Sequence, residues 1–229
     1  MPGKYVTVLI PAYNEEDVIR GTVNAAWAIR GVKQVIVVDD GSGDRTAEAA
    51  GKSGAQVVVI GRNLGKGGAL TAGARHADGE VVLLIDADLG QSASQAEMLS
   101  YPVIRGEADM TVAVFPPARK KAGFGLVKGL ARAGIRHFTG IEMEAPLSGQ
   151  RAMRRDLLLK LLPLAGGYGV EVDLTVRAVI MGCRIKEVPV NMSHRATGRD
   201  LSSFIHRGRQ LSHVALTLWN LKTAGCGGV

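Results

Sequence analysis

The sequence predicts an α/β protein built on a doubly wound, mostly parallel sheet. Apolar, strand-like runs alternate with helical segments four times within residues 1–90. Each run is apolar at successive positions rather than at every second one, which is typical of parallel strands covered by helices on both faces. Polar clusters follow three of the four runs, and ligands of such sheets bind beyond the carboxyl ends of the strands.

The 229 residues are expected to form a single domain, 1–229, with the regular alternation in 1–90 and an elaborated C-terminal part in 91–229. Runs rich in β-branched residues predict strands at 5–10, 35–38, 57–60 and 81–85. The segments between them predict helices at 14–29, 44–52 and 67–77. Pro11 is expected to stop the first strand, and Asn14 to cap the first helix.

The second half is less regular. Strands are expected at 109–115 and 184–190, and helices at 120–139, 156–162, 171–181 and 199–221. The last helix combines apolar residues with His206, Arg207 and Arg209. That composition suits packing on the domain or on a second subunit, as in a homodimer, and it also leaves open a peripheral contact with a membrane surface.

Composition excludes several classes of protein. Aromatic residues make up only 4% of the chain, and no nucleic-acid module motif is present, so we expect no nucleic-acid partner. Cys183 and Cys226 stand alone without a CxxC motif, which argues against a disulfide framework and suits a reducing cytoplasm. The N-terminus does not resemble a signal peptide, and no apolar run approaches the ~20 residues that cross a bilayer. We expect a cytoplasmic protein, with peripheral contact at the inner membrane surface as the alternative.

Charge is distributed unevenly along the chain. Residues 1–115 carry more Asp and Glu than Lys and Arg, whereas the remainder is strongly basic and brings the formal net charge to +7. An acidic half beside a basic half suggests a metal or base site next to an anion site. A solvated basic surface is the alternative interpretation.

Asp86 and Asp88 follow the buried run 81–85 and are separated by one residue. Hard cations such as Mg²⁺ and Mn²⁺ prefer carboxylate oxygens, so this pair predicts a metal site that would neutralise a diphosphate. An Asp-x-Asp triplet on its own could be a surface turn, but its position at the end of a buried strand favours the metal site.

Two further clusters are candidates for nucleotide contacts. Asp39 and Asp40 end the second strand, and a carboxylate there could accept hydrogen bonds from the N–H groups of uracil or guanine, or cap the next helix. A glycine-rich turn at 63–69 opens a helix, where backbone amides and Lys66 could meet a phosphate. Taken alone, that turn could equally be a simple loop.

The motifs at 8–15, 37–42, 63–67 and 86–88 together resemble family 2 glycosyltransferases of the GT-A fold. The run 63–89 is most similar to the dolichyl- or polyprenyl-phosphate sugar synthases. The resemblance implies that Pro11, Tyr13, Glu15 and Asp40 hold the nucleoside of a nucleotide-sugar. It implies that Asp86 and Asp88 hold the metal and the donor, with Asp88 the more direct ligand. On this basis, 1–90 is the nucleotide-sugar-binding half and 91–229 the acceptor-binding half.

In the second half, the runs 146–149 and 167–171 instead look like glucosyl-3-phosphoglycerate synthases. That resemblance implies acceptor contacts at Ser148 and Gly149 and a third metal ligand at His194. A surface-loop histidine is the alternative for His194. Arg195 and Arg199 flank it and could each grip a phosphate through the planar guanidinium group, or else make surface ion pairs.

Glu171 and Asp173 are the candidate bases, because transfer to a hydroxyl needs a proton acceptor and transfer to an ionised phosphate does not. The sequence therefore predicts a Mg²⁺- or Mn²⁺-dependent enzyme that moves a sugar from a nucleotide-sugar, with UDP-glucose the first choice, to a phosphate-bearing acceptor. Polyprenyl phosphate and a small phosphorylated acceptor both stay open. A sugar-phosphate nucleotidyltransferase and a non-catalytic nucleotide-sugar binder are the less favoured alternatives.

Overall fold

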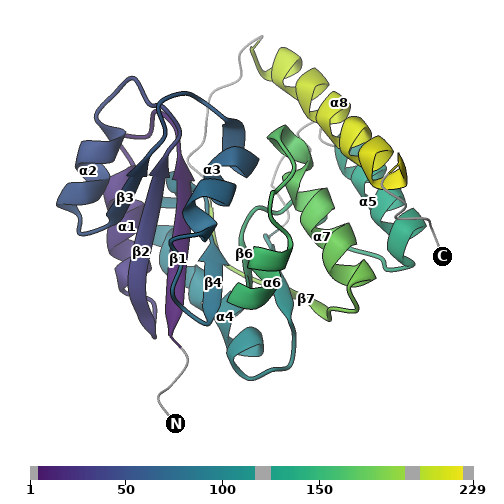
Figure 1. The fold of residues 1–229 in the computed structure, drawn as a ribbon, viewed down its shortest axis with the longest axis horizontal. Coiled ribbons are helices and arrows are strands. Elements are labelled where there is room, and N and C mark those ends of the chain that lie inside the picture. Colours follow the sequence, from purple (N-terminus) through teal and green to yellow (C-terminus); the bar gives the residue numbers. More distant parts are fainter. Residues whose placement is uncertain (1–4, 117–124, 194–201, 224–229) are drawn as a thin grey trace.

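The computed structural model describes residues 5–116, 125–193 and 202–223. Its centre is a seven-stranded sheet with the order β3-β2-β1-β4-β6-β5-β7 (Figure 1). The strands are β1 (Val6–Ala12), β2 (Val32–Asp39), β3 (Gln56–Val59), β4 (Val81–Leu84), β5 (Met110–Val114), β6 (Arg151–Arg154) and β7 (Ile185–Pro189). All neighbours pair in parallel except β6, which is antiparallel to both β4 and β5. The predicted α/β class and mostly parallel sheet are confirmed.

Helices cover both faces of the sheet. They are α1 (Ile19–Trp27), α2 (Thr46–Lys52), α3 (Gly65–Ala74), α4 (Glu97–Ile104), α5 (Gly125–Thr139), α6 (Arg155–Lys160), α7 (Val170–Ile180) and α8 (Ser202–Thr223), with 3₁₀ segments η1 (Ala87–Ala96) and η2 (Gly167–Gly169). Within the described ranges, no helix combines the length and hydropathy that a membrane crossing needs. In Figure 1, α5 and α8 lie side by side at the end of the molecule farthest from α2.

Successive residues of the central strands pack into different hydrophobic cores on the two faces of the sheet. Val8 and Ile10 belong to the core under α1, η1 and α4, whereas Leu9 belongs to the core under α3, α6 and α7. All three side chains are fully buried. A third core joins Val112 of β5 to α5, α7 and α8. Burial on both faces explains why the strands are apolar at successive positions.

Two expectations for the first loop are wrong. Pro11 does not stop β1, which runs to Ala12. The pairing of β4 with β1 ends at Leu9, so Pro11 has a strand neighbour on one side only, and a missing N–H is tolerated there. Asn14 does not cap α1, which begins at Ile19. Asn14 instead adopts a positive φ of 55° and exchanges hydrogen bonds with the Ser42–Gly43 turn.

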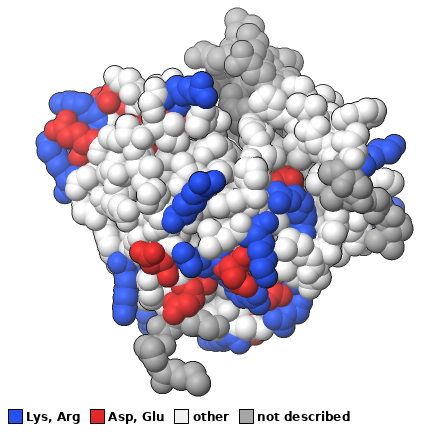
Figure 2. Space-filling model, in the orientation of Figure 1, with Lys and Arg blue, Asp and Glu red and all other residues white. Residues whose placement is uncertain are grey.

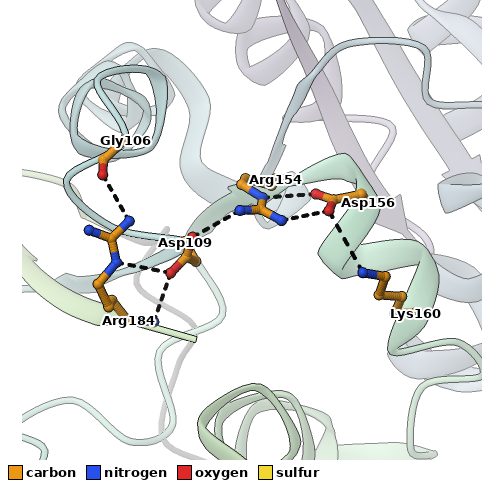
Figure 3. A network of polar contacts seen from close by, with 6 residues as sticks. All are labelled: Gly106, Asp109, Arg154, Asp156, Lys160 and Arg184. Atoms are coloured by element: carbon orange, nitrogen blue, oxygen red, sulfur yellow. Dashed lines mark hydrogen bonds and ion pairs between the residues drawn. The ribbon is translucent and has the colours of Figure 1, made fainter. Parts of the chain in front are cut away.

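Several elements of the structure were not predicted from the sequence, among them β6, η1 and α4. A polar network fixes the end of β6 that lies away from the strand ends discussed below (Figure 3). Asp109 accepts hydrogen bonds from the backbone N–H of Arg184 at 2.9 Å and from the Arg154 guanidinium at 3.1 Å. Arg154 also pairs with Asp156 at 2.6 Å. Three segments distant in sequence are thereby held together at one edge of the sheet.

Charged side chains of both signs intermingle on the face in Figure 2, where acidic groups lie beside basic ones below the centre. The unequal charge of the two halves of the sequence therefore does not appear on this face as separate acidic and basic surfaces. Ion pairs link the acidic and basic halves, as between Asp109 and Arg184.

Candidate active site

The carboxyl ends of β1, β2 and β4 meet at one edge of the sheet, as their polar clusters predict. A cavity of about 270 Å³ opens there and is called the first cavity. Its lining contains the residues Pro11, Ala12, Tyr13, Glu15, Asp40, Lys66, Ala69, Asp86, Ala87 and Asp88. Every residue that the sequence predicts for the nucleotide-sugar is in this set. The structure thus brings them together around one cavity.

The two aspartates that end β2 have different surroundings. Asp39 accepts a hydrogen bond from the backbone N–H of Ser42 at 3.1 Å and another from its hydroxyl, which closes the turn after the strand. Asp40 accepts a hydrogen bond from the backbone N–H of Leu64 at 2.7 Å and also lines the first cavity. Neither caps α2. Asp40 therefore links the β2 end to the glycine-rich turn before α3.

Lys66 lies in the first turn of α3 and forms two ion pairs. Its Nζ is 2.7 Å from Oδ1 of Asp86 and 3.0 Å from Oε1 of Glu171. Burial alone would lower the pKa of Lys66, but the charges of Asp86 and Glu171 outweigh it and raise that pKa above its ordinary value. Lys66 is therefore a permanent cation that holds α3, β4 and α7 together.

A second cavity of about 450 Å³ lies beside the first and shares Lys66 and Asp86 with it. The second cavity is lined by Lys66, Asp86, Phe115, Val127, Leu147, Ser148, Gly149, Gln150, Gly167, Glu171 and Gln210. The predicted acceptor residues Ser148 and Gly149 are among them. The ion pair of Lys66 with Asp86 thus lies at the boundary between the two cavities.

The segment before β6 forms one wall of the second cavity. Gln150 donates a hydrogen bond from Nε2 to Oδ2 of Asp86 at 2.6 Å. A Cβ atom at Gly149 would overlap the Lys66 ammonium and lie 3.2 Å from the Asp86 oxygens, so a side chain at this position would have to displace the ammonium. The sequence did not single out Gln150, although it stands directly after the Ser148–Gly149 motif.

Arg151 holds the segment before β6 in place through hydrogen bonds. Its guanidinium is fully buried and donates hydrogen bonds to the carbonyl of Ser148 at 2.9 Å and to the Thr175 hydroxyl at 2.9 Å. Burial lowers the pKa of Arg151 to about 10, and the nearby charge of Glu171 opposes that shift. No sequence signal distinguishes this arginine from the surface arginines around it.

The carboxylates of Asp86 and Asp88 in the first cavity suit a divalent cation. Asp86 and Asp88 both line the first cavity, and an ammonium group already lies against Asp86, so this carboxylate attracts a cation. Two carboxylates with open space beside them fit Mg²⁺ or Mn²⁺, which keep several water ligands. Within the described ranges, no group of three or more His, Cys, Asp or Glu residues could hold a metal, and the predicted third ligand His194 lies outside those ranges.

Other predicted residues are not brought together here. Asp173 lies on α7 with its carboxylate 3.2 Å from Arg177, and it lines a different cavity, with Pro163 and Thr217. Burial raises the pKa of Asp173, and Arg177 opposes that shift. Because Asp173 lines neither the first nor the second cavity, its geometry does not suit a catalytic base. Arg195 and Arg199, like His194, fall outside the described residues.

A mostly parallel sheet with two adjoining cavities and paired carboxylates at its strand ends is the architecture of a GT-A glycosyltransferase. Residues 7–162 match Glycosyl transferase family 2. The chain belongs to this family and is a glycosyltransferase.

Curated relatives agree with this assignment. An uncharacterized glycosyltransferase of Mycobacterium tuberculosis is 34% identical over 212 residues, which are 91% of this chain and 94% of the relative. Glycosyltransferase AglJ of Haloferax volcanii is 30% identical over 85% of this chain and 65% of the relative. An undecaprenyl-phosphate 4-deoxy-4-formamido-L-arabinose transferase of Salmonella choleraesuis is 27% identical over 89% of this chain and 64% of the relative.

Among solved structures, the chain is similar to glucosyl-3-phosphoglycerate synthase of Mycobacterium tuberculosis. The complex of that enzyme with Mg²⁺ and UDP has a TM-score of 0.79 at 30% identity, and the match covers 97% of this chain and 80% of the other. Its complex with Mn²⁺, UDP-glucose and phosphoglyceric acid has a TM-score of 0.78 at 29% identity, covering 95% and 80%. Both resemblances noted in the sequence, to the lipid-phosphate enzymes and to the phosphoglycerate enzymes, thus reappear.

Proposed function

We propose that this glycosyltransferase moves a hexose from a UDP-sugar, with UDP-glucose the first candidate, to a phosphate-bearing acceptor. The observation that carries the proposal is the pair of cavities that meet at Lys66 and Asp86. A transferase must hold its donor and its acceptor at adjoining positions, so that the reacting atoms lie in contact. The bound UDP, UDP-glucose and phosphoglyceric acid of the similar structures support this choice of ligands.

The first cavity suits the nucleotide. Asp40 offers a carboxylate to the N–H group of the base, and the half-exposed Tyr13 offers a ring against its face. Asp86 and Asp88 would hold Mg²⁺ or Mn²⁺ with the diphosphate, while Lys66 adds positive charge from the other side. A divalent cation bound there would neutralise the charge that builds up on the departing diphosphate.

The second cavity suits the acceptor, with Ser148 and Gly149 on one wall and Glu171 near the boundary. In the reaction, the bond between the anomeric carbon and the UDP oxygen breaks, and its electron pair leaves with UDP. A bond forms from the acceptor oxygen to the same carbon, and any proton on that oxygen passes to a base or to water. Asp86 and Glu171 are the carboxylates that line this cavity. Since Asp86 is assigned to the metal, Glu171 is the candidate base, and Lys66 lies 3.0 Å from it.

The test is release of UDP from UDP-glucose by the purified chain, with and without Mn²⁺, in the presence of phosphoglyceric acid or undecaprenyl phosphate. We expect transfer that depends on the metal and on one of the two acceptors. Asp88→Asn should abolish transfer with the fold intact. Asp78→Asn is the matched control, because Asp78 is an exposed acid just before β4, at the opposite edge of the sheet. Equal activity of the two variants would refute the role given to Asp88.

The metal-independent binding of UDP-glucose without turnover on either acceptor would instead favour a non-catalytic binding module. A homodimer, a peripheral membrane contact and a cytoplasmic location stay predictions.

A further inference from the structure

Gln210 has an unusual environment within the second cavity. It lies on α8, which packs against α5 and α7, and it lines the second cavity. Its side-chain oxygen Oε1 is buried and has no hydrogen-bond partner in the structure, and it is the only such side-chain atom among the described residues. Gln210 thus borders the second cavity and carries a buried acceptor atom that has no donor.

Orphaned acceptors of this kind are rare because burying an amide oxygen without a donor destabilises the folded state. A methionine or leucine at position 210 would fill similar space without that cost. An unsatisfied buried oxygen therefore needs an explanation, and beside a cavity one explanation is a ligand that supplies the missing donor.

The other charged groups of the cavity restrict what that ligand is. The Lys66 ammonium is already engaged by Asp86 and Glu171, and Gln150 donates to Asp86. Glu171 is itself an acceptor, so the cavity offers Gln210 and Glu171 as two acceptors for hydrogen-bond donors. A hydroxyl group can donate, whereas the ionised phosphate and hydrocarbon chain of a polyprenyl phosphate cannot.

We propose that Oε1 of Gln210 accepts a hydrogen bond from a hydroxyl of the acceptor substrate and thereby selects a hydroxyl-bearing acceptor over polyprenyl phosphate. This inference rests on the proposed function. Gln210 lines the second cavity and is absent from the first, which holds the predicted nucleotide residues. The contact therefore belongs to the acceptor, and the UDP-sugar binds without it.

Gln210→Met tests the inference because methionine has nearly the same length and shape but cannot accept this hydrogen bond. Leu216→Met is the matched control, since Leu216 is an exposed residue of the same helix and lines neither cavity. Transfer is measured with UDP-glucose, Mn²⁺ and either phosphoglyceric acid or undecaprenyl phosphate. The midpoint of thermal unfolding is measured for each protein without ligands.

We expect Gln210→Met to raise the KM for phosphoglyceric acid about tenfold, the loss of one hydrogen bond, with the KM for UDP-glucose unchanged. The unfolding midpoint should stay equal or rise, because an unsatisfied buried oxygen has been removed. A purely structural glutamine would show a lower midpoint instead. Leu216→Met should match the wild type in both measurements.

Three results would overturn the inference. They are an unchanged KM for phosphoglyceric acid, a raised KM for UDP-glucose, and transfer by the wild type to undecaprenyl phosphate alone. In each of them the proposed function stands. If the wild type transfers glucose to neither acceptor, the proposed function fails. The unfolding midpoints then still decide the structural premise, since a lower midpoint for Gln210→Met would mean that Oε1 has a protein partner.

Discussion

Lys66 is the cation that neutralises two carboxylates at the boundary between the cavities, and Lys66→Met removes that charge while keeping the length of the side chain. Asp86 and Glu171, which lie 2.7 and 3.0 Å from its Nζ, would then face each other without a counter-charge. We expect the variant to be less stable than the wild type and to be rescued by a divalent cation.

The magnitude follows from the two contacts that are lost. A hydrogen bond to a charged group contributes roughly 1.5–3 kcal/mol when it is well shielded from water. The Lys66, Asp86 and Glu171 side chains are 28%, 27% and 10% exposed, so water compensates part of the loss. We therefore expect the free energy of unfolding to fall by about 2 kcal/mol, which lowers the unfolding midpoint of a chain of this size by about 5 °C.

The assay is urea unfolding of the wild type and of Lys66→Met, in chelator and in millimolar Mn²⁺. A cation that binds only the folded protein stabilises it by mass action, and Asp86 is more available once the ammonium is gone. Mn²⁺ should therefore stabilise the variant more than the wild type. Lys52→Met is the control, because it breaks an ion pair with Glu48 whose side chains are 64% and 52% exposed. It should leave stability nearly unchanged with or without metal.

Two results would refute this reasoning. If Lys66→Met is as stable as the wild type in chelator, the ion pairs do not hold α3, β4 and α7 together. If Mn²⁺ stabilises both proteins equally, the cation does not bind at Asp86, and the proposed metal site must lie elsewhere.

Three further predictions concern single residues. The backbone N–H of Arg184 and its guanidinium hold the pKa of Asp109 below its ordinary value of 3.8, although burial has a smaller opposing effect. The ionised carboxylate therefore stabilises the fold at pH values above 3.8. This contribution is lost as the pH falls through the lowered pKa of the folded protein. Asp109→Asn should lose roughly 1 kcal/mol at pH 7 and show a shallower acid decline in urea titrations, whereas an unchanged pH profile would contradict the network. Gly149→Ala should displace the Lys66 ammonium, reduce turnover severalfold and lower the unfolding midpoint by no more than Lys66→Met does; full activity would mean that Lys66 and Asp86 can move at no cost. Asp40→Ala should weaken UDP binding, measured by calorimetry, by about 1–3 kcal/mol. Equal affinity of the variant and the wild type would mean that Asp40 does not contact the uracil base.

The first half of the fold could be predicted from the sequence because β1, β4 and most of β2 are buried on both faces. The apolar runs that become β1, β2, β3 and β4 are interrupted only by their polar ends, so both the strands and the edge at which they meet are visible in the pattern. Element ends were less predictable. The delayed start of α1 depends on the Ser42–Gly43 turn, which contacts Asn14 from a distant part of the chain.

The strand β6 could not be predicted, because its four residues, Arg-Ala-Met-Arg, have charged residues at both ends. Arg151 is buried by contacts that only the tertiary structure supplies, with Ser148 and Thr175. The sequence did not single out Gln210 for a similar reason. A glutamine between apolar and basic residues of a helix carries no pattern, and its significance comes from the cavity it borders and from the partner it lacks.

The direction of β6 explains how the second cavity acquires its wall. Because β6 is antiparallel to β4, its beginning lies at the edge where β4 ends, and Gln150 reaches Asp86 across that edge. A parallel strand in the same place would bring Arg154 to the site and carry Gln150 about 13 Å away, at a rise of about 3.3 Å per residue. The Ser148–Gly149 segment would then be absent from the second cavity. A single antiparallel strand in a parallel sheet thus brings a segment of the second half of the chain to the carboxylates of the first, which is what a site for two substrates requires.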